Sequence, residues 1–263
     1  MNEQLDNSQI PENIPVHHNV VNITPDHENF TRVNSFLSEY FLGKGEYESE
    51  EIIKARFNQP FNPNNIHAKF FMKAIFDNDT LIGARAHQIV IPQDDAPEAV
   101  PVIVFLMNIL VDKNNKNKGA GAALRQAAQD DVIDMTNNTV HQKRPVLYVA
   151  EMEPFDPNDP ESLSRYKAYI KSGFRLINPN QLRYKQLDDP TKNSGEKMDL
   201  MVAKELNHHE WDEETSVPKI HIEQVIAALK YSYTAVGYAY NSETEPKIIT
   251  DSPSYETQAI PSI

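Results

Sequence analysis

The chain has 263 residues, of which 40% are apolar and 24% are charged, and this composition is typical of a globular protein with one large domain. The absence of cysteine excludes disulfides, thiolate metal sites and a cysteine nucleophile. The net charge of −13 disfavours nucleic acid and anionic membranes as partners, because their charge is also negative. We expect neither partner. With no membrane-spanning apolar run and no visible secretory signal, we expect a cytoplasmic monomer or homodimer.

The amino-terminal region predicts an arm, a strand and two helices. Residues 1–17 are polar and without periodicity, so we expect a flexible arm. Residues 18–24 predict a strand. The pair Thr24-Pro25 is typical of a helix start, and apolar side chains at helical spacing continue as far as Gly43. Residues 50–57 predict a second, short helix.

The central region predicts a sheet with one long helix. Three successive strands are expected over 68–76, 81–91 and 100–111. The third is a nearly continuous apolar run, which is typical of a strand covered on both faces of a sheet. An alanine-rich helix over 118–135 and an apolar strand over 145–152 follow. A strand–helix–strand unit favours parallel pairing, whereas the three successive strands favour antiparallel pairing.

The carboxy-terminal region predicts a helix over 161–172 that ends at Gly173, two strands over 174–177 and 197–205, and an amphipathic helix over 217–233 with Tyr233 on its apolar side. The fold class expected is α/β (α+β), with a central mixed, mostly antiparallel sheet flanked by helices. The domain boundaries expected are a core domain over 18–206, a helical extension packed on it over 207–240, and a flexible tail over 241–263.

The loop between the central apolar strand and the alanine-rich helix carries the clearest functional signal. Gly119 and Gly121 are two of only eight glycines in the chain, and three lysines lie at 113, 116 and 118. A helix N-terminus exposes unpaired N–H groups, and glycine lets a ligand approach the backbone, so the loop suits a pyrophosphate. The alternative is an ordinary solvated loop. A Walker loop is absent, and Leu124 stands where a dinucleotide-binding loop would have its third glycine.

Two motifs here resemble one known family. Ile109-Leu110-Val111 followed by Lys116-Asn117-Lys118-Gly119-Ala120-Gly121 is similar to the acetyl-CoA signature of the GCN5-related N-acetyltransferases (the GNAT superfamily), with lysine where glutamine or arginine is usual. Tyr169-Ile170-Lys171-Ser172-Gly173-Phe174 is similar to the family's Y-x-K-x-G-F segment. The motifs stand in the family's order. Ser162 and Arg165 depart from its usual asparagine and alanine.

The resemblance implies an acetyl-CoA-dependent N-acetyltransferase that moves an acetyl group directly to a primary amine in a ternary complex. It implies that strands 100–111 and 145–152 separate, and that the pantetheine arm lies in this opening along Ile109, Leu110 and Val111. It also implies a pyrophosphate at residues 116–121, and Tyr169 as the acid that protonates the leaving thiolate. The alternative for Tyr169 is an ordinary core tyrosine. No metal is expected, and His208 and His209 are too poorly disposed to chelate one.

The general base is sought at the end of strand 145–152. Glu151 and Glu153 share one face of that strand, and a carboxylate at the mouth of a partly buried strand tends to have a raised pKa. We prefer Glu151 because it is nearer the apolar stretch. Ordinary solvated acids are the alternative.

The acidic charge predicts a cationic acceptor, either a small molecule or a peptide amine, because a cleft of one charge concentrates the opposite ion. The alternative function is a non-catalytic acyl-CoA-binding or regulatory module on the same fold.

Overall fold

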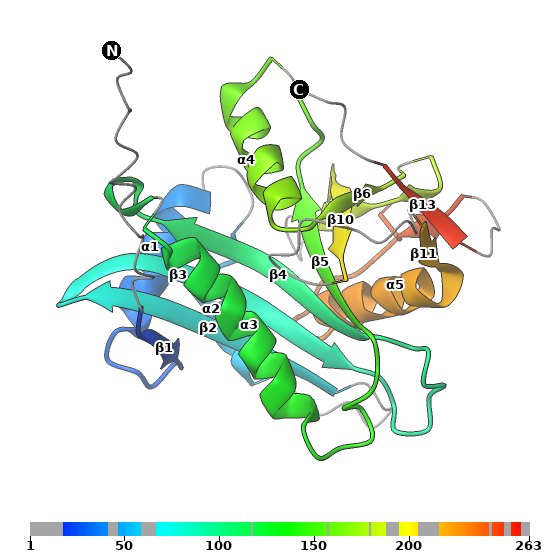
Figure 1. The fold of residues 1–263 in the computed structure, drawn as a ribbon, viewed down its shortest axis with the longest axis horizontal. Coiled ribbons are helices and arrows are strands. Elements are labelled where there is room, and N and C mark those ends of the chain that lie inside the picture. The colour runs from blue at the N-terminus through cyan, green and yellow to red at the C-terminus, as the bar shows by residue number, and fades with distance from the viewer. Residues whose placement is uncertain are drawn as a thin grey trace, which may run out of the picture.

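The computed structural model forms one large sheet with helices on both faces (Figure 1). The residues that the structure describes are 18–41, 47–58, 67–116, 118–156, 158–178, 180–187, 195–204, 216–241, 244–249 and 254–258. Within these residues, no helix is both long enough and apolar enough to cross a membrane. The expected arm over 1–17 lies outside the described residues.

The elements follow the predicted order closely. The first half contains β1 (Val20–Ile23), α1 (Phe30–Phe41), α2 (Glu50–Phe57), β2 (His67–Asp77), β3 (Thr80–Ile91), β4 (Val102–Val111), a 3-10 turn (Lys113–Asn115) and α3 (Ala120–Thr136). The second half contains β5 (Val146–Met152), α4 (Pro160–Lys171), β6 (Arg175–Ile177), β10 (Asp199–Ala203) and α5 (Lys219–Thr234). The remaining strands are short: β7 (Leu182–Arg183), β8 (Lys185–Leu187), β9 (Gly195–Lys197), β11 (Ser216–Pro218), β12 (Lys247–Ile248) and β13 (Ser254–Gln258).

The main sheet is mixed and mostly antiparallel, as predicted. Its strand order is β1-β2-β3-β4-β5-β10-β6-β13-β11, and β4 and β5 form its one parallel pair among the described strands. This pair is joined by α3, and a helical crossover of this kind is the usual connection between parallel neighbours. The predicted fold class is therefore confirmed.

Strands β4 and β5 separate part of the way along, which confirms the predicted opening. They pair only from Val102 opposite Val146 to Phe105 opposite Val149. Beyond Phe105, β4 contains a bulge, because Leu106 and Asn108 pair with neighbouring residues of β3 and leave Met107 as the extra residue. A bulge bends its strand and increases its twist. The bend coincides with the point where β4 leaves β5, so the last six residues of β4 are not paired with β5.

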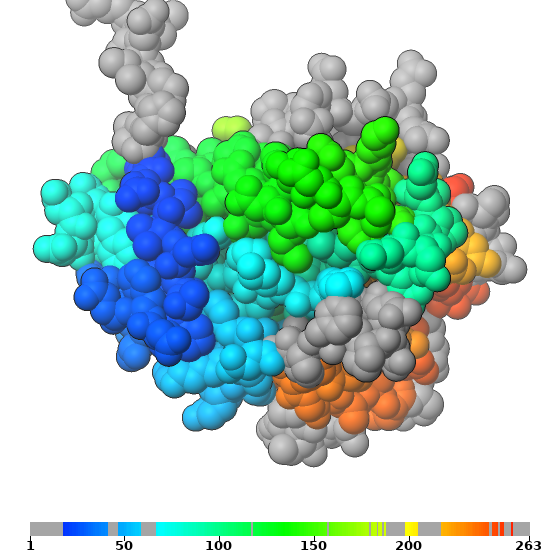
Figure 2. Space-filling model, turned by 90° about the horizontal axis from the view of Figure 1, so that it is seen from below, coloured from blue at the N-terminus to red at the C-terminus, as the bar shows by residue number. Residues whose placement is uncertain are grey.

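The helices cover the sheet from two sides. In Figure 2 the strands β2 and β3 (cyan) lie between α3 (green) on one side and α2 and α5 (light blue and orange) on the other. Helices α3 and α4 bury their apolar stripes against one face, where Ala128, Val132 and Tyr166 share a core with β4 and β5. Helices α1, α2 and α5 bury theirs against the opposite face. The opening between β4 and β5 therefore lies between two faces of the sheet that are covered by different helices.

One boundary expectation needs correction. A flexible tail was expected over 241–263, but within it β12 pairs with β7, and β13 pairs with both β6 and β11. Serine- and threonine-rich sequence can still supply a strand where an exposed sheet edge offers backbone partners.

Candidate functional site

A cleft of about 250 Å³ lies where β4 and β5 separate. Its walls come from the end of β4, the end of β5, helix α4 and the last turn of α1. Six of the residues singled out in the sequence line this one cleft: Ile109, Leu110, Val111, Lys116, Glu151 and Tyr169. The structure therefore brings together residues that are up to 60 positions apart in the sequence.

The loop that enters α3 is built as the glycines predict. Gly119 has φ +87°, a left-handed conformation that favours glycine, and it occupies the position before the first helical residue. It has no side chain to cap the helix, so the N–H groups of the first turn remain open to a ligand. The Nζ of Lys118 donates to Oδ1 of Asn115 at 3.1 Å, and the Nε2 of His18 donates to the Lys118 carbonyl at 2.7 Å.

The remaining loop residues fall into two groups. Ala120 is buried and begins α3, and a Cβ added at Gly121 would make only ordinary contacts, with Arg125 Nη1 at 3.6 Å and Val111 Cγ2 at 3.9 Å. Asn117, which was also expected to contact the cofactor, lies outside the described residues. Apart from Asn117, the expected phosphate residues thus form one continuous turn beside the end of β4.

Helix α4 positions Tyr169 through capping at both of its ends. Asp159 caps the start, where its carboxylate accepts from the N–H groups of Glu161 and Ser162 at 3.1 and 2.9 Å. At the other end Gly173 has φ +90°, and the N–H of Phe174 donates back to the Tyr169 carbonyl at 3.1 Å. This turn brings the Phe174 ring edge-on to the Tyr169 ring, with 5.2 Å between centroids. Tyr169 is therefore held at the edge of the core and also lines the cleft.

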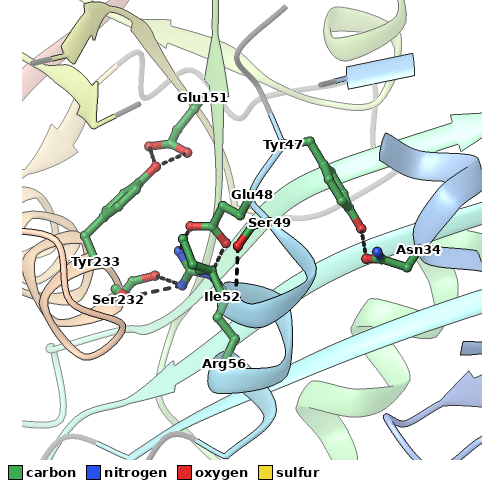
Figure 3. A network of polar contacts seen from close by, with 9 residues as sticks. All are labelled: Asn34, Tyr47, Glu48, Ser49, Ile52, Arg56, Glu151, Ser232 and Tyr233. Atoms are coloured by element: carbon green, nitrogen blue, oxygen red, sulfur yellow. Dashed lines mark hydrogen bonds and ion pairs between the residues drawn. The ribbon is translucent and has the colours of Figure 1, made fainter. Parts of the chain in front are cut away.

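Glu151 is held by two tyrosines, of which Tyr233 is drawn in Figure 3. The hydroxyl of Tyr233, from α5, donates to both carboxylate oxygens at 3.2 Å, and the hydroxyl of Tyr184 also donates to this carboxylate. Burial raises the pKa of Glu151, and these two hydrogen bonds lower it in part. The raised pKa expected from the sequence is confirmed. A buried carboxylate that is held in a fixed position and has a raised pKa is suited to accept a proton from a substrate.

A buried cation lies behind this carboxylate. Arg56 from α2 is 1% exposed and pairs with Glu48, and its Nη1 donates to the Oγ of Ser232 at 2.9 Å. The same guanidinium lies 5.6 Å from the centre of the Tyr233 ring. Figure 3 shows Arg56 with its partners Glu48 and Ser232, and Tyr233 with Glu151 beside them. Arg56 also lowers the pKa of Glu151 through its charge. Helices α2 and α5 thus fix the position of Tyr233, and the hydroxyl of Tyr233 in turn fixes the carboxylate of Glu151.

The two candidate acids differ in their partners. Glu153 forms an ion pair with Arg165 of α4, and the pair lies at the mouth of the cleft, with the Glu153 side chain 41% exposed. Glu151 forms no ion pair among the described residues, and its partners are neutral hydroxyls. Because the Glu153 carboxylate is occupied by the Arg165 guanidinium, whereas the partners of Glu151 are neutral hydroxyls, the geometry favours Glu151 as the proton acceptor.

The sequence did not point to the residues that surround Glu151. Tyr233 was expected to pack on the apolar side of its helix, which it does, but its hydrogen bond to Glu151 joins residues 82 positions apart. Tyr184 and Arg56 lie in segments without any motif. The only sequence signal for Arg56 is that a charged residue occupies a position on the inward-facing, apolar side of α2. The expected absence of a metal at His208 and His209 concerns residues outside the described part of the chain.

Comparison with known proteins gives similar solved structures only. No family model and no curated protein matches the chain. A putative acetyltransferase of the GNAT family from Bacteroides thetaiotaomicron is 18% identical, over 84% of this chain and 99% of that chain, with a TM-score of 0.45. The ribosomal-protein-S18-alanine N-acetyltransferase from Escherichia coli is 13% identical over 75% of this chain and 98% of that one, with a TM-score of 0.40.

A third solved structure is a GNAT family acetyltransferase from Elizabethkingia anophelis with acetyl-CoA bound. It is 16% identical over 71% of this chain and 97% of that one, with a TM-score of 0.38. Identities and TM-scores this low concern the general arrangement of the elements. The activity is therefore inferred below from the residues of this chain.

Proposed function

We propose that this chain is an acyl-CoA-dependent N-acyltransferase that moves an acyl group, acetyl in the simplest case, directly to a primary amine in a ternary complex. The observation that carries the proposal is the single cleft lined by the unpaired edge of β4, Glu151 and Tyr169. The unpaired edge suits an extended chain with amide groups, such as pantetheine, because backbone N–H and C=O groups at a free strand edge seek partners.

The turn at the start of α3 suits the pyrophosphate of CoA. The open N–H groups that follow Gly119 and the positive end of the helix dipole favour an anion, and Lys116 and Lys118 add positive charge. Since both lysines are exposed, their individual contributions are small. From this turn, the donor extends into the cleft along Ile109, Leu110 and Val111.

The two sides of the opening suit the two substrates. Tyr169 belongs to the side of α3 and α4, where the turn of α3 also lies, whereas Glu151 belongs to the side of α2 and α5. The donor thus occupies the first side, and the amine approaches from the second. Tyr40, Phe41 and Met198 also line the cleft and give the amine partly apolar walls.

Each reacting proton has a residue to move it. Glu151 takes the proton that the amine must lose before it attacks the thioester carbon. As the nitrogen–carbon bond forms and the carbon–sulfur bond breaks, Tyr169 gives its hydroxyl proton to the departing sulfur. Transfers of this kind contribute about 10²- to 10⁴-fold to a rate. The acceptor is a cationic small molecule or peptide amine, which the net charge of −13 would attract.

The test uses the full chain, acetyl-CoA and a panel that contains a polyamine, an amino sugar and a lysine peptide. We expect release of free thiol with one amine or more, together with the acyl mass on that amine. Glu151→Gln should lower kcat at least a hundredfold and leave acetyl-CoA binding intact. Binding without turnover of any amine in the panel would instead support the non-catalytic acyl-CoA-binding module.

A further inference from the structure

A second, smaller cavity of about 60 Å³ opens beside the cleft, on the side of α3 and α4. The two cavities share Ile109, Ala168 and Tyr169, so they meet at the residue proposed to protonate the leaving sulfur. Two cations, Arg85 from β3 and Arg125 from α3, line the smaller cavity. The proposed reaction with an acetyl donor uses neither of them.

Arg85 is a buried charge that lacks a carboxylate partner. It is 1% exposed, and its Nη1 donates to the Leu124 carbonyl at 3.2 Å. Its Nε is buried without a hydrogen-bond partner, and among the described residues no acid forms an ion pair with it. Asp131, whose charge acts on Arg85, is already held by Lys73 at 2.7 Å and lies 3.1 Å from His87. Burial of an uncompensated charge is costly, so an unpaired arginine of this kind indicates an anionic ligand.

The electrostatics of Arg85 agree with this interpretation. Burial, together with a smaller effect of the neighbouring charge of Arg125, lowers the pKa of Arg85 to about 10. Even so, the group stays protonated at neutral pH. Two guanidinium groups beside one small cavity repel each other, and an anion placed between them would relieve that repulsion.

The size of the cavity limits the anion. A water-sized group needs about 10–15 Å³ of cavity volume, so a cavity of about 60 Å³ holds roughly four to six non-hydrogen atoms. Beyond the thioester carbonyl, a malonyl group has four non-hydrogen atoms and a succinyl group has five. The remaining walls include Leu106 and Phe174, which suit the methylene carbons of such a chain. A phosphate or a whole nucleotide would not place apolar atoms against these two side chains.

We infer that the donor site accepts acyl groups of three or four carbons that end in a carboxylate, with Arg85 and Arg125 binding that carboxylate. The inference rests on the proposed acyl transfer for the location of the thioester at Tyr169. A guanidinium binds a carboxylate through two parallel hydrogen bonds, and the side chains of Arg85 and Arg125 both line the cavity that the carboxylate would enter. The carboxylate passes unchanged into the amide product, while the carbon–sulfur bond breaks as in acetyl transfer.

The experiment measures binding, so that it does not depend on knowledge of the amine. Titration calorimetry on the full chain compares malonyl-CoA and succinyl-CoA with acetyl-CoA, propionyl-CoA and butyryl-CoA. We expect the better of the two carboxylated donors to bind at least tenfold more tightly than the neutral donor of the same length. Equal affinity for the neutral donor, or a preference for acetyl-CoA, would overturn the inference.

Variants separate charge from shape. Arg85→Met and Arg125→Met should each remove most of the tenfold preference while changing acetyl-CoA affinity less than threefold. Lys143→Met, on the exposed loop before β5, is the matched loss of one positive charge and should leave the preference unchanged. If Arg85→Met fails to fold, Arg125→Met decides, because Arg125 is only partly buried. A preference that survives both arginine variants would contradict the assignment.

The same titrations keep this inference distinct from the proposed function. A carboxylate preference in binding without turnover of any amine would refute the transferase and leave the anion site standing. Turnover with acetyl-CoA and no carboxylate preference would do the reverse.

Discussion

Replacement of Tyr233 by phenylalanine removes one hydroxyl from the site and tests how Glu151 works. That hydroxyl donates to both oxygens of the carboxylate at 3.2 Å. The bonds favour the charged form and therefore hold the pKa of Glu151 below the value that burial alone would set. Without them the pKa rises, and the carboxylate form that accepts the amine proton begins to appear only at higher pH.

The magnitude follows from the geometry. A hydrogen bond to a charged group contributes about 1.5–3 kcal/mol, and the two contacts are long and share one donor, which favours the lower end of that range. Since about 1.4 kcal/mol corresponds to one pKa unit, the acidic limb of the kcat/KM profile should move up by about one pH unit. Tyr184, Tyr240, Arg56 and Glu48 also act on this carboxylate and remain in the variant.

The assay is the pH dependence of kcat/KM for the wild type and Tyr233→Phe, with the amine that gives the highest rate. Tyr231→Phe is the matched control, because Tyr231 lies two residues before Tyr233 on the same helix and its side chain therefore points to a different side of that helix. A melting temperature for each variant separates loss of fold from loss of the bond. An acidic limb that stays in place in a folded Tyr233→Phe variant, or moves to lower pH, would refute Glu151 as the base.

Three further predictions concern the acid, the phosphate site and the acceptor. Tyr169→Phe should lower kcat at least tenfold with little change in acetyl-CoA affinity, and an equal rate in single-turnover assays would return Tyr169 to a packing role. Gly121→Glu should abolish acetyl-CoA binding in calorimetry while the melting temperature stays near that of the wild type, because an added Cβ meets only ordinary contacts there; retained affinity would contradict a phosphate site at this turn. For a cationic acceptor, kcat/KM should fall as ionic strength rises, and a salt-independent value or a preference for neutral amines would exclude attraction by the acidic surface.

The sequence predicted local structure well where one physical signal dominates. The apolar run that forms β4 is a local pattern, and this strand lies within a few residues of its expected bounds. The helix start expected at Thr24-Pro25 was wrong, because Thr24 begins a turn, in which its carbonyl accepts from the N–H of His27, and α1 begins only at Phe30. Gly119 and Gly173 both adopt positive φ angles, so the glycines chosen as markers of backbone geometry were informative. The strands β7, β8, β9 and β12, of two or three residues, were missed, because such short segments have no periodicity of their own.

The candidate site was predictable on one side only. On the side of α3 and α4, the loop and Tyr169 belong to contiguous motifs, and the resemblance of these motifs to those of a known family pointed to them. On the other side, the partners of Glu151 come from α2, β7–β8 and α5, three segments that meet only after the sheet is assembled. A single sequence contains no pattern that shows which of these distant segments come into contact. Arg85 and Arg125, the two cations that line the small cavity, were missed for the same reason. Arg85, for example, lies in the middle of a strand that is otherwise mostly apolar.

The position of Tyr233 also bears on the role of the carboxy-terminal region. Helix α5 packs Ile222, Val225 and Leu229 into the same core as β5 and β10, and about one turn after Leu229 it brings Tyr233 to Glu151. One helix therefore both closes the apolar face of the sheet and completes the hydrogen bonding of the proposed base. A helix that only covered apolar surface would need no hydroxyl at this depth, and burial of one without a partner would be costly. The acceptor side of the cleft thus depends on α5 for its chemistry as well as for its shape.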